Sequence, residues 1–170
     1  MRVARLSRPL SSRRLAALAT SLLRGSKLCA IATVNSDGGA HVNTAYFAYG
    51  EDFALVWCSA PQARHSRNVR ERPRIAITVF DSTQTWGRED RGIQLFGTAR
   101  ELARGAAADA VRLYVKRFPD ATDIAQTYRF YRFRPRRVKL FDERRFGGAT
   151  WVTARIAGGL LAWQRTERYV

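Results

Sequence analysis

The chain has 170 residues, of which 46% are hydrophobic, and a formal net charge of +16. This length predicts one domain with one core, and the apolar share excludes wholesale disorder. We expect no membrane span, because no apolar run approaches the roughly 18 residues that one needs.

The positive charge comes almost entirely from arginine, since Lys27, Lys116 and Lys139 are the only lysines. An excess of this size suggests nucleic-acid binding, but the arginines are spread along the chain and are not gathered in one stripe. A GC-rich genome, which encodes Arg where others use Lys, explains the excess better. Nucleic acid is therefore not the expected partner, whereas a phosphate-bearing cofactor would suit some of these side chains.

The two cysteines, Cys29 and Cys58, each lie inside an apolar run. A disulfide framework would need more cysteines in a shorter chain, and no Cys-x-x-Cys spacing exists for a metal. Both are predicted to be small buried residues of a reduced, cytoplasmic protein. With two histidines, no clustered carboxylates and no Gly-x-Ser-x-Gly elbow, we expect neither a metal site nor a nucleophilic catalytic residue.

The first 14 residues are basic and contain no acid, a composition also found in transit peptides. We favour a solvated basic arm over residues 1–14, because an amphipathic helix packed on the domain is predicted directly after it. Apolar residues recur there at helical spacing, namely Leu15, Leu18, Leu22 and Leu23. The folded domain is expected over residues 15–148, and residues 149–170 are expected to form a tail that contacts a dimer mate.

Short β-rich runs separated by turn signals predict strands, and Asp37-Gly38 between two such runs indicates a hairpin. Pro61 begins a short helix that ends before Pro73, and residues 106–118 predict a second helix. The six predicted strands are 28–35, 40–49, 53–58, 74–81, 92–102 and 128–142. The pattern predicts a mainly β (α+β) fold, a six-stranded antiparallel barrel with flanking helices.

The segment from Ser59 to Asn68 concentrates polar chemistry at the start of the first predicted barrel helix. It contains the Ser59 hydroxyl, the Arg64 and Arg67 guanidiniums, the His65 imidazole and free helix N-terminal amides. Such a set suits a phosphate monoester through charge-assisted hydrogen bonds and the helix dipole. A solvated helix face with ordinary arginines explains the composition equally well.

The order and spacing of several short motifs resemble the FMN-binding split-barrel superfamily that includes pyridoxamine-phosphate oxidase. The resemblance is strongest between Cys29 and Leu102 and looser towards the end of the chain. The motifs are Ala32-Thr33-Val34, Asp37-Gly38, His41-Val42, Ser59, Arg64-His65, Arg67-Asn68, Arg72-Pro73-Arg74 and Gly97-Thr98-Ala99.

The resemblance implies a split β-barrel that forms a homodimer and holds FMN at the subunit interface. Family members bind the FMN phosphate at positions that match Ser59, Arg64 and His65, and Asn68 belongs to the same motif. The strand that lines the flavin ring matches His41, Asn43, Thr44 and Ala45. Gln94 would contact the cofactor from the dimer mate, and Trp86 and Trp151 would stack across the interface or pack as ordinary aromatics.

The function that follows is an FMN-dependent oxidoreductase acting on a small-molecule redox substrate, with no catalytic side chain. The oxidase's C-terminal substrate signature is missing, so vitamin B6 is not the expected substrate. Alternatives are a deazaflavin-dependent reductase and a non-catalytic flavin- or haem-binding module, with His41 and His65 as the axial ligands available. Arginines alternating with aromatics over residues 128–134 also fit a nucleic-acid surface, although a strand at a dimer interface explains them as well.

Overall fold

The computed structural model describes residues 1–121 and 123–170 and divides the chain into two compact units. The first unit comprises Met1–Ser26, Thr78–Leu95 and Arg136–Val170, and the second comprises Lys27–Ile77 and Phe96–Pro135. Both units consist mainly of antiparallel strands with a few helices, so the predicted mainly β fold is confirmed. Among the described residues, no helix is long and apolar enough to cross a membrane.

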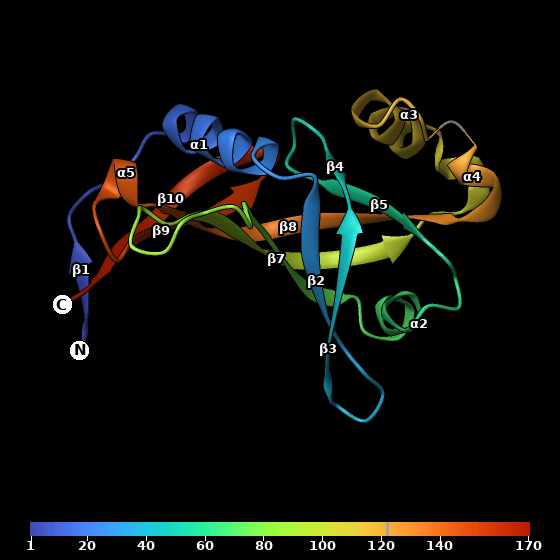
Figure 1. Cartoon of the computed structure of the whole chain (residues 1–170), viewed down its shortest axis with the longest axis horizontal. Helices are drawn as coiled ribbons and strands as arrows, with labels where there is room; N and C mark the ends of the chain where they lie inside the picture. Colours follow the sequence, from blue (N-terminus) through green and yellow to red (C-terminus); the bar gives the residue numbers. More distant parts are fainter. Residues whose placement is uncertain (122) are drawn as a thin grey trace. The chain divides into compact units, whose positions relative to one another are not determined.

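The strands of the first unit follow the hydrogen-bonded order β1, β10, β9, β8, β7, β6. Their bounds are β1 Val3–Leu6, β10 Leu160–Tyr169, β9 Thr150–Ala157, β8 Arg129–Asp142, β7 Arg91–Glu101 and β6 Arg74–Phe80, and the last three also contribute residues to the second unit. The unit contains the helices α1 (Ser12–Arg24) and α5 (Glu143–Phe146), and Figure 1 shows α1 beside β10.

Helix α1 confirms the amphipathic helix that the leucine spacing predicts. The Ser11 side chain accepts a hydrogen bond from the backbone N–H of Arg14 and so caps the first turn. All four predicted leucines are buried on the inner side of the helix, at Leu15, Leu18, Leu22 and Leu23. The hydrophobic face therefore supplies the packing that holds this helix in place.

The two ends of the chain are more ordered than the sequence suggests. The basic arm contains β1, which pairs with β10 from Val3 opposite Tyr169 to Leu6 opposite Thr166. The expected C-terminal tail is the hairpin of β9 and β10, which turns at Gly158-Gly159 with positive φ at both glycines. A Gly-Gly pair between two β-rich runs is a known hairpin signal, so this hairpin could have been predicted.

The second unit contains the other predicted strands in the hydrogen-bonded order β4, β5, β8, β7, β6, β2, β3. The strands not yet located are β2 Leu28–Val34, β3 Ala40–Tyr46, β4 Ala48–Tyr49 and β5 Leu55–Ser59. The helices are α2 Arg64–Glu71, the 3-10 turn η1 Arg104–Ala106, α3 Ala108–Arg117 and α4 Ile124–Thr127. All six predicted strands are thus present, and the structure adds β1, β9 and β10 while dividing the second predicted strand into β3 and β4.

The hairpin of β2 and β3 has the turn that Asp37-Gly38 predicts. Gly38 has a φ of 86°, which favours glycine, and the Asn35 N–H donates to the Gly39 carbonyl at 2.8 Å. Along β3 the residues alternate strictly between exposed and partly buried. This alternation places His41 and Asn43 on one face of the sheet and Val42 and Thr44 on the other.

The core of the second unit forms between α3 and the strands that α3 covers. Tyr114 and Ala110 of α3 pack with Phe130, Val56 and Leu102 in one buried cluster. This arrangement confirms the second predicted helix.

Gly97 of β7 lies directly against the backbone of β8. A Cβ atom built on Gly97 would lie 2.7 Å from Pro135 Cα and nearer still to the Arg134 carbonyl oxygen. Real Cβ atoms do not come this close to backbone atoms, so the first half of β8 lies against β7 only because position 97 has no side chain.

We therefore expect Gly97→Ala to lower the free energy of unfolding by about 1–3 kcal/mol, because the two strands must separate to admit a methyl group. Urea denaturation followed by circular dichroism measures the change. Gly105→Ala is the matched control, since a Cβ at Gly105 meets no atom within 4 Å. Equal stability of the two variants would refute the close-contact argument.

Candidate functional site

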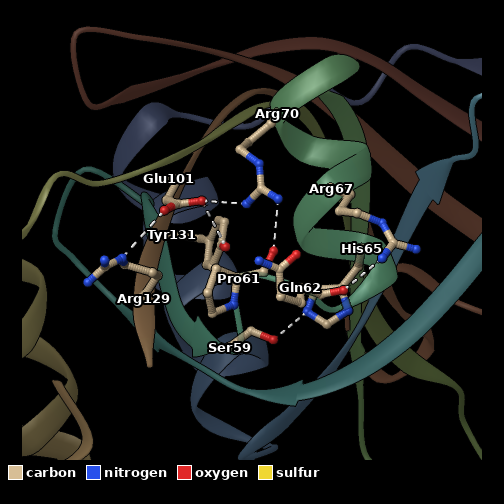
Figure 2. Close-up of polar contacts among 9 residues, drawn as sticks. All are labelled: Ser59, Pro61, Gln62, His65, Arg67, Arg70, Glu101, Arg129 and Tyr131. Atoms are coloured by element: carbon tan, nitrogen blue, oxygen red, sulfur yellow. Dashed lines mark hydrogen bonds and ion pairs between the residues drawn. The ribbon is translucent and has the colours of Figure 1, made fainter. Parts of the chain in front are cut away.

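The turn between β5 and α2 brings the first predicted site residues together (Figure 2). Ser59 is the last residue of β5, and His65 lies in the first turn of α2. The Ser59 Oγ and His65 Nε2 atoms are 2.7 Å apart and share a hydrogen bond. His65 is buried, with 6% of its surface exposed, so its side chain is held in place beside Ser59.

The environment of His65 favours its neutral form. Burial lowers the pKa of His65 below the ordinary value of 6.5, and the charge of nearby His41 lowers it further. The two imidazole rings are parallel to within 2°, with ring centres 6.4 Å apart. A neutral imidazole can either donate to or accept from the Ser59 hydroxyl, and it can gain a proton when an anion approaches.

Asn68 anchors α2 to the end of β2. Its side-chain amide donates to Thr33 Oγ1 and to Asn35 Oδ1, both at 3.0 Å. Asn68 and Thr33 are both buried, so these hydrogen bonds are shielded from water. Asn68, predicted as a cofactor contact, is therefore observed as a structural link between helix and strand.

Two arginines of α2 hold the turn that precedes the helix, as Figure 2 shows. Arg67 donates to the Gln62 carbonyl at 3.1 Å, and Arg70 donates to the Pro61 carbonyl at 2.8 Å. The second terminal nitrogen of Arg70 donates to Glu101 Oε2 at 2.7 Å. The backbone of the turn is thus fixed by guanidinium groups on both of its central carbonyls.

Glu101 is the hub of this network, and sequence reasoning missed it. Besides Arg70 it accepts a hydrogen bond from the Tyr131 hydroxyl at 3.1 Å, and Arg129 lies 3.7 Å from its other oxygen. Burial raises the pKa of Tyr131, which keeps the phenol protonated as a donor. No local sequence pattern could have indicated Glu101, because its contact with α2 forms only when the sheet has folded.

Arg64 differs from the other arginines of the helix. It is exposed, and no side-chain partner for it is found in the part of the chain that the structure describes. The residue before it, Ala63, offers no side-chain cap to the first turn of α2. The first helical N–H groups and the Arg64 guanidinium therefore remain available at the start of α2.

The residues predicted to line the flavin ring do not all face the same way. His41 faces α2 and lies beside His65, and Asn43 and Ala45 share its partly buried face of β3. Thr44 lies on the opposite, exposed face with Val42 and Tyr46. A side-chain contact from Thr44 to a ligand beside His65 is not compatible with this alternation.

The remaining predicted residues, Trp86, Gln94 and Trp151, belong to the first unit. Trp86 is 99% exposed in the loop between β6 and β7. Gln94 lines a shallow cavity of about 270 Å³ that also includes Phe80 and Phe141.

Trp151 is buried within the first unit, with 5% of its surface exposed. Its indole N–H donates to Glu167 at 2.9 Å. The Tyr169 ring lies 4.8 Å away and the Lys139 ammonium lies 4.2 Å above the indole ring. The ring and the polar edge of this side chain thus both make contacts within its own unit.

Neither a metal site nor a reactive thiol is found in residues 1–121 and 123–170. No group of three or more His, Cys, Asp or Glu residues is arranged to hold a metal ion. Burial raises the pKa of Cys29 to about 12 and also raises that of Cys58. Both thiols are free and protonated at neutral pH.

Comparison with known proteins identifies the fold. Residues 15–142 match the family model of pyridoxamine 5'-phosphate oxidase. No curated protein sequence matches the chain.

Solved structures with the same fold are distant in sequence. A haem binding protein from Mycobacterium smegmatis is 15% identical with a TM-score of 0.65, over 97% of this chain and 90% of that chain. A pyridoxinephosphate oxidase family protein from Clostridium acetobutylicum is 14% identical with a TM-score of 0.63, over 86% and 97%. An FAD-binding protein from Mesorhizobium loti is 21% identical with a TM-score of 0.59, over 79% and 95%.

The family match covers α1 from Leu15 onwards, both predicted barrel helices and all six predicted strands. The structural neighbours share the split-barrel architecture that the sequence motifs imply. On these grounds, the chain belongs to the pyridoxamine 5'-phosphate oxidase family.

Proposed function

We propose that this protein is an FMN-dependent oxidoreductase that binds its flavin at the interface of a homodimer. The observation that supports it most directly is the Ser59–His65 hydrogen bond at the start of α2, whose first turn has no side-chain cap and carries the exposed Arg64. These groups fit a phosphate monoester, which needs hydrogen-bond donors and positive charge converging from different directions. FMN would supply the hydride or electron transfer to a small-molecule substrate.

In this proposal the protein binds and orients the cofactor and supplies no acid or base. Ser59, Arg64 and His65 would hold the phosphate. His41, Asn43 and Ala45 share one face of β3, and the flavin ring would lie against this face. Trp86 and Gln94 would reach the cofactor from the partner copy. The free, protonated thiols of Cys29 and Cys58 agree with a reduced cytoplasmic location.

The exposed face of the β2–β3 hairpin supports the homodimer. Leu28, Val34, Val42 and Tyr46 lie on it and are 46%, 39%, 64% and 55% exposed. Leu28 pairs with Tyr46, and Ala32 pairs with Val42, so the apolar side chains form one continuous strip. Monomers rarely expose such strips, and a second copy of the same strip would bury it.

Haem binding is the second candidate, favoured by the geometry of the two histidines. His41 and His65 are the chain's only histidines and lie side by side, and one structural neighbour is a haem binding protein. His65 Nε2 is already engaged by Ser59, which leaves His41 as the better axial ligand. The absorption spectrum of the purified protein, with the mass of any released molecule, separates flavin bands from a haem Soret band.

The double variant Arg64→Ala with His65→Ala is expected to weaken FMN binding by about 100-fold, because two charge-assisted contacts to the phosphate are lost. Quenching of flavin fluorescence during titration measures the dissociation constant. Arg100→Ala, which removes an exposed arginine of β7, serves as the control with unchanged affinity. FMN affinity equal to wild type in the double variant would exclude this phosphate site.

FMN binding is expected to take up a proton at His65. The depressed pKa leaves His65 neutral at pH 7 in the free protein, and a phosphate dianion within hydrogen-bond reach raises that pKa. Affinity should therefore increase as the pH falls from about 8 towards the second phosphate pKa of about 6. Titration calorimetry in two buffers of different ionisation enthalpy counts the protons.

His65→Asn should abolish this proton uptake, and His41→Asn should retain it. Heats of FMN binding that do not depend on the buffer in the wild-type protein would contradict the assignment of His65.

Val42→Glu is expected to dissociate the dimer, because it places a carboxylate at the centre of the apolar strip. Light scattering after size-exclusion chromatography measures the mass of the particle. Leu160→Glu adds the same charge at an apolar residue that is 67% exposed outside the strip, and it should leave the mass unchanged. A wild-type protein that is already monomeric would refute the proposed interface.

A further inference from the structure

The second unit contains a cavity of about 350 Å³ beside α3. None of the predicted flavin residues lines it. Its apolar lining comes from α3, α4 and β8 and from residues directly flanking these elements and β7, namely Leu102, Ala107, Ala108, Val111, Ala125, Tyr128 and Phe130. Leu102, Ala107 and Phe130 also belong to the buried core cluster, so the cavity has a rigid floor. Its volume lies within the range of roughly 300–1,000 Å³ that small-molecule sites occupy.

Three arginines complete the lining, namely Arg104, Arg112 and Arg129. Arg112 forms an ion pair with Asp109 on the exposed side of α3. Arg129 lies 3.7 Å from Glu101, a carboxylate that already accepts closer hydrogen bonds from Arg70 and Tyr131.

Arg104 has no ion-pair partner among the described residues. The described lining residues include neither Asp nor Glu. The cavity therefore combines an apolar floor with positive charge that the protein itself only partly compensates.

We propose that this cavity binds a small organic anion with an apolar body, of the class of medium-chain or single-ring carboxylates. The apolar body would lie against Val111 and Phe130, whose burial supplies the hydrophobic contribution to binding. The carboxylate would be held by the guanidiniums of Arg104 and Arg129, whose planar donor groups match a carboxylate. The proposal does not depend on FMN binding, because the two sites share no residue.

Titration calorimetry with octanoate tests the proposal, with 1-octanol as the neutral analogue of the same length. The wild-type protein should bind octanoate in a one-to-one ratio and at least about tenfold more tightly than 1-octanol, since only octanoate can contact the arginines. Equal affinity for the two compounds, or no binding of octanoate at millimolar concentration, would overturn the proposal.

Two kinds of variant then locate the site. Arg104→Gln combined with Arg129→Gln should weaken octanoate binding by about tenfold, because two charge-assisted contacts are lost in a partly exposed site. The same double variant should leave 1-octanol binding unchanged. Ala108→Trp places a large side chain on an exposed lining position and should abolish the binding of both compounds. Arg100→Gln removes the same charge from a residue that does not line the cavity, and it should bind octanoate as the wild type does. Octanoate affinity that survives both lining variants would place the ligand elsewhere and refute the assignment.

Discussion

The candidate site depends on how firmly α2 is held against the strands around it. The Asn68 amide links the helix to Thr33 and Asn35 at the end of β2. On the other side, Arg70 links it to Glu101 and to the carbonyl of Pro61. Because these links are polar and directional, they fix the helix in rotation as well as in distance.

Without these links the contact between Ser59 and His65 would have no fixed geometry. The groups at the start of the helix can keep a fixed arrangement for a ligand because later residues of the same helix are hydrogen-bonded to the protein around them. The two parts of α2 therefore have different roles. Its first turn carries the groups proposed to bind a ligand, and its later residues form hydrogen bonds to the rest of the protein.

Sequence reasoning predicted the local elements well, because each depends on residues that are close in the chain. The leucine spacing predicted α1, Asp37-Gly38 predicted the hairpin, and all six predicted strands are present. The missed strands lie at the two ends, where β1 finds its partner only in the last strand of the chain. A four-residue strand without an internal signal cannot be recognised before its partner is known.

The structure brings two of the predicted site residues into contact and adds partners around them that the sequence did not indicate. Ser59 and His65 were expected to act together, and they share a hydrogen bond. The roles of Asn68 and Glu101 depend on residues 35 and 30 positions away in the chain, and no spacing rule contains that information. The arginine excess also has a partly structural explanation, since Arg67 and Arg70 bind carbonyl groups that would otherwise lack fixed partners.

The pairing of β1 with β10 has a consequence for the order in which the chain folds. The hydroxyl of Thr166 donates to the carbonyl of Arg8 across 158 sequence positions, and the backbones of Arg2 and Val170 exchange hydrogen bonds in both directions. Closing a loop of this length is entropically slow and is compensated only once the intervening strands have formed. The first strand of the chain is therefore among the last to dock, and its amide hydrogens are among the first to exchange with solvent.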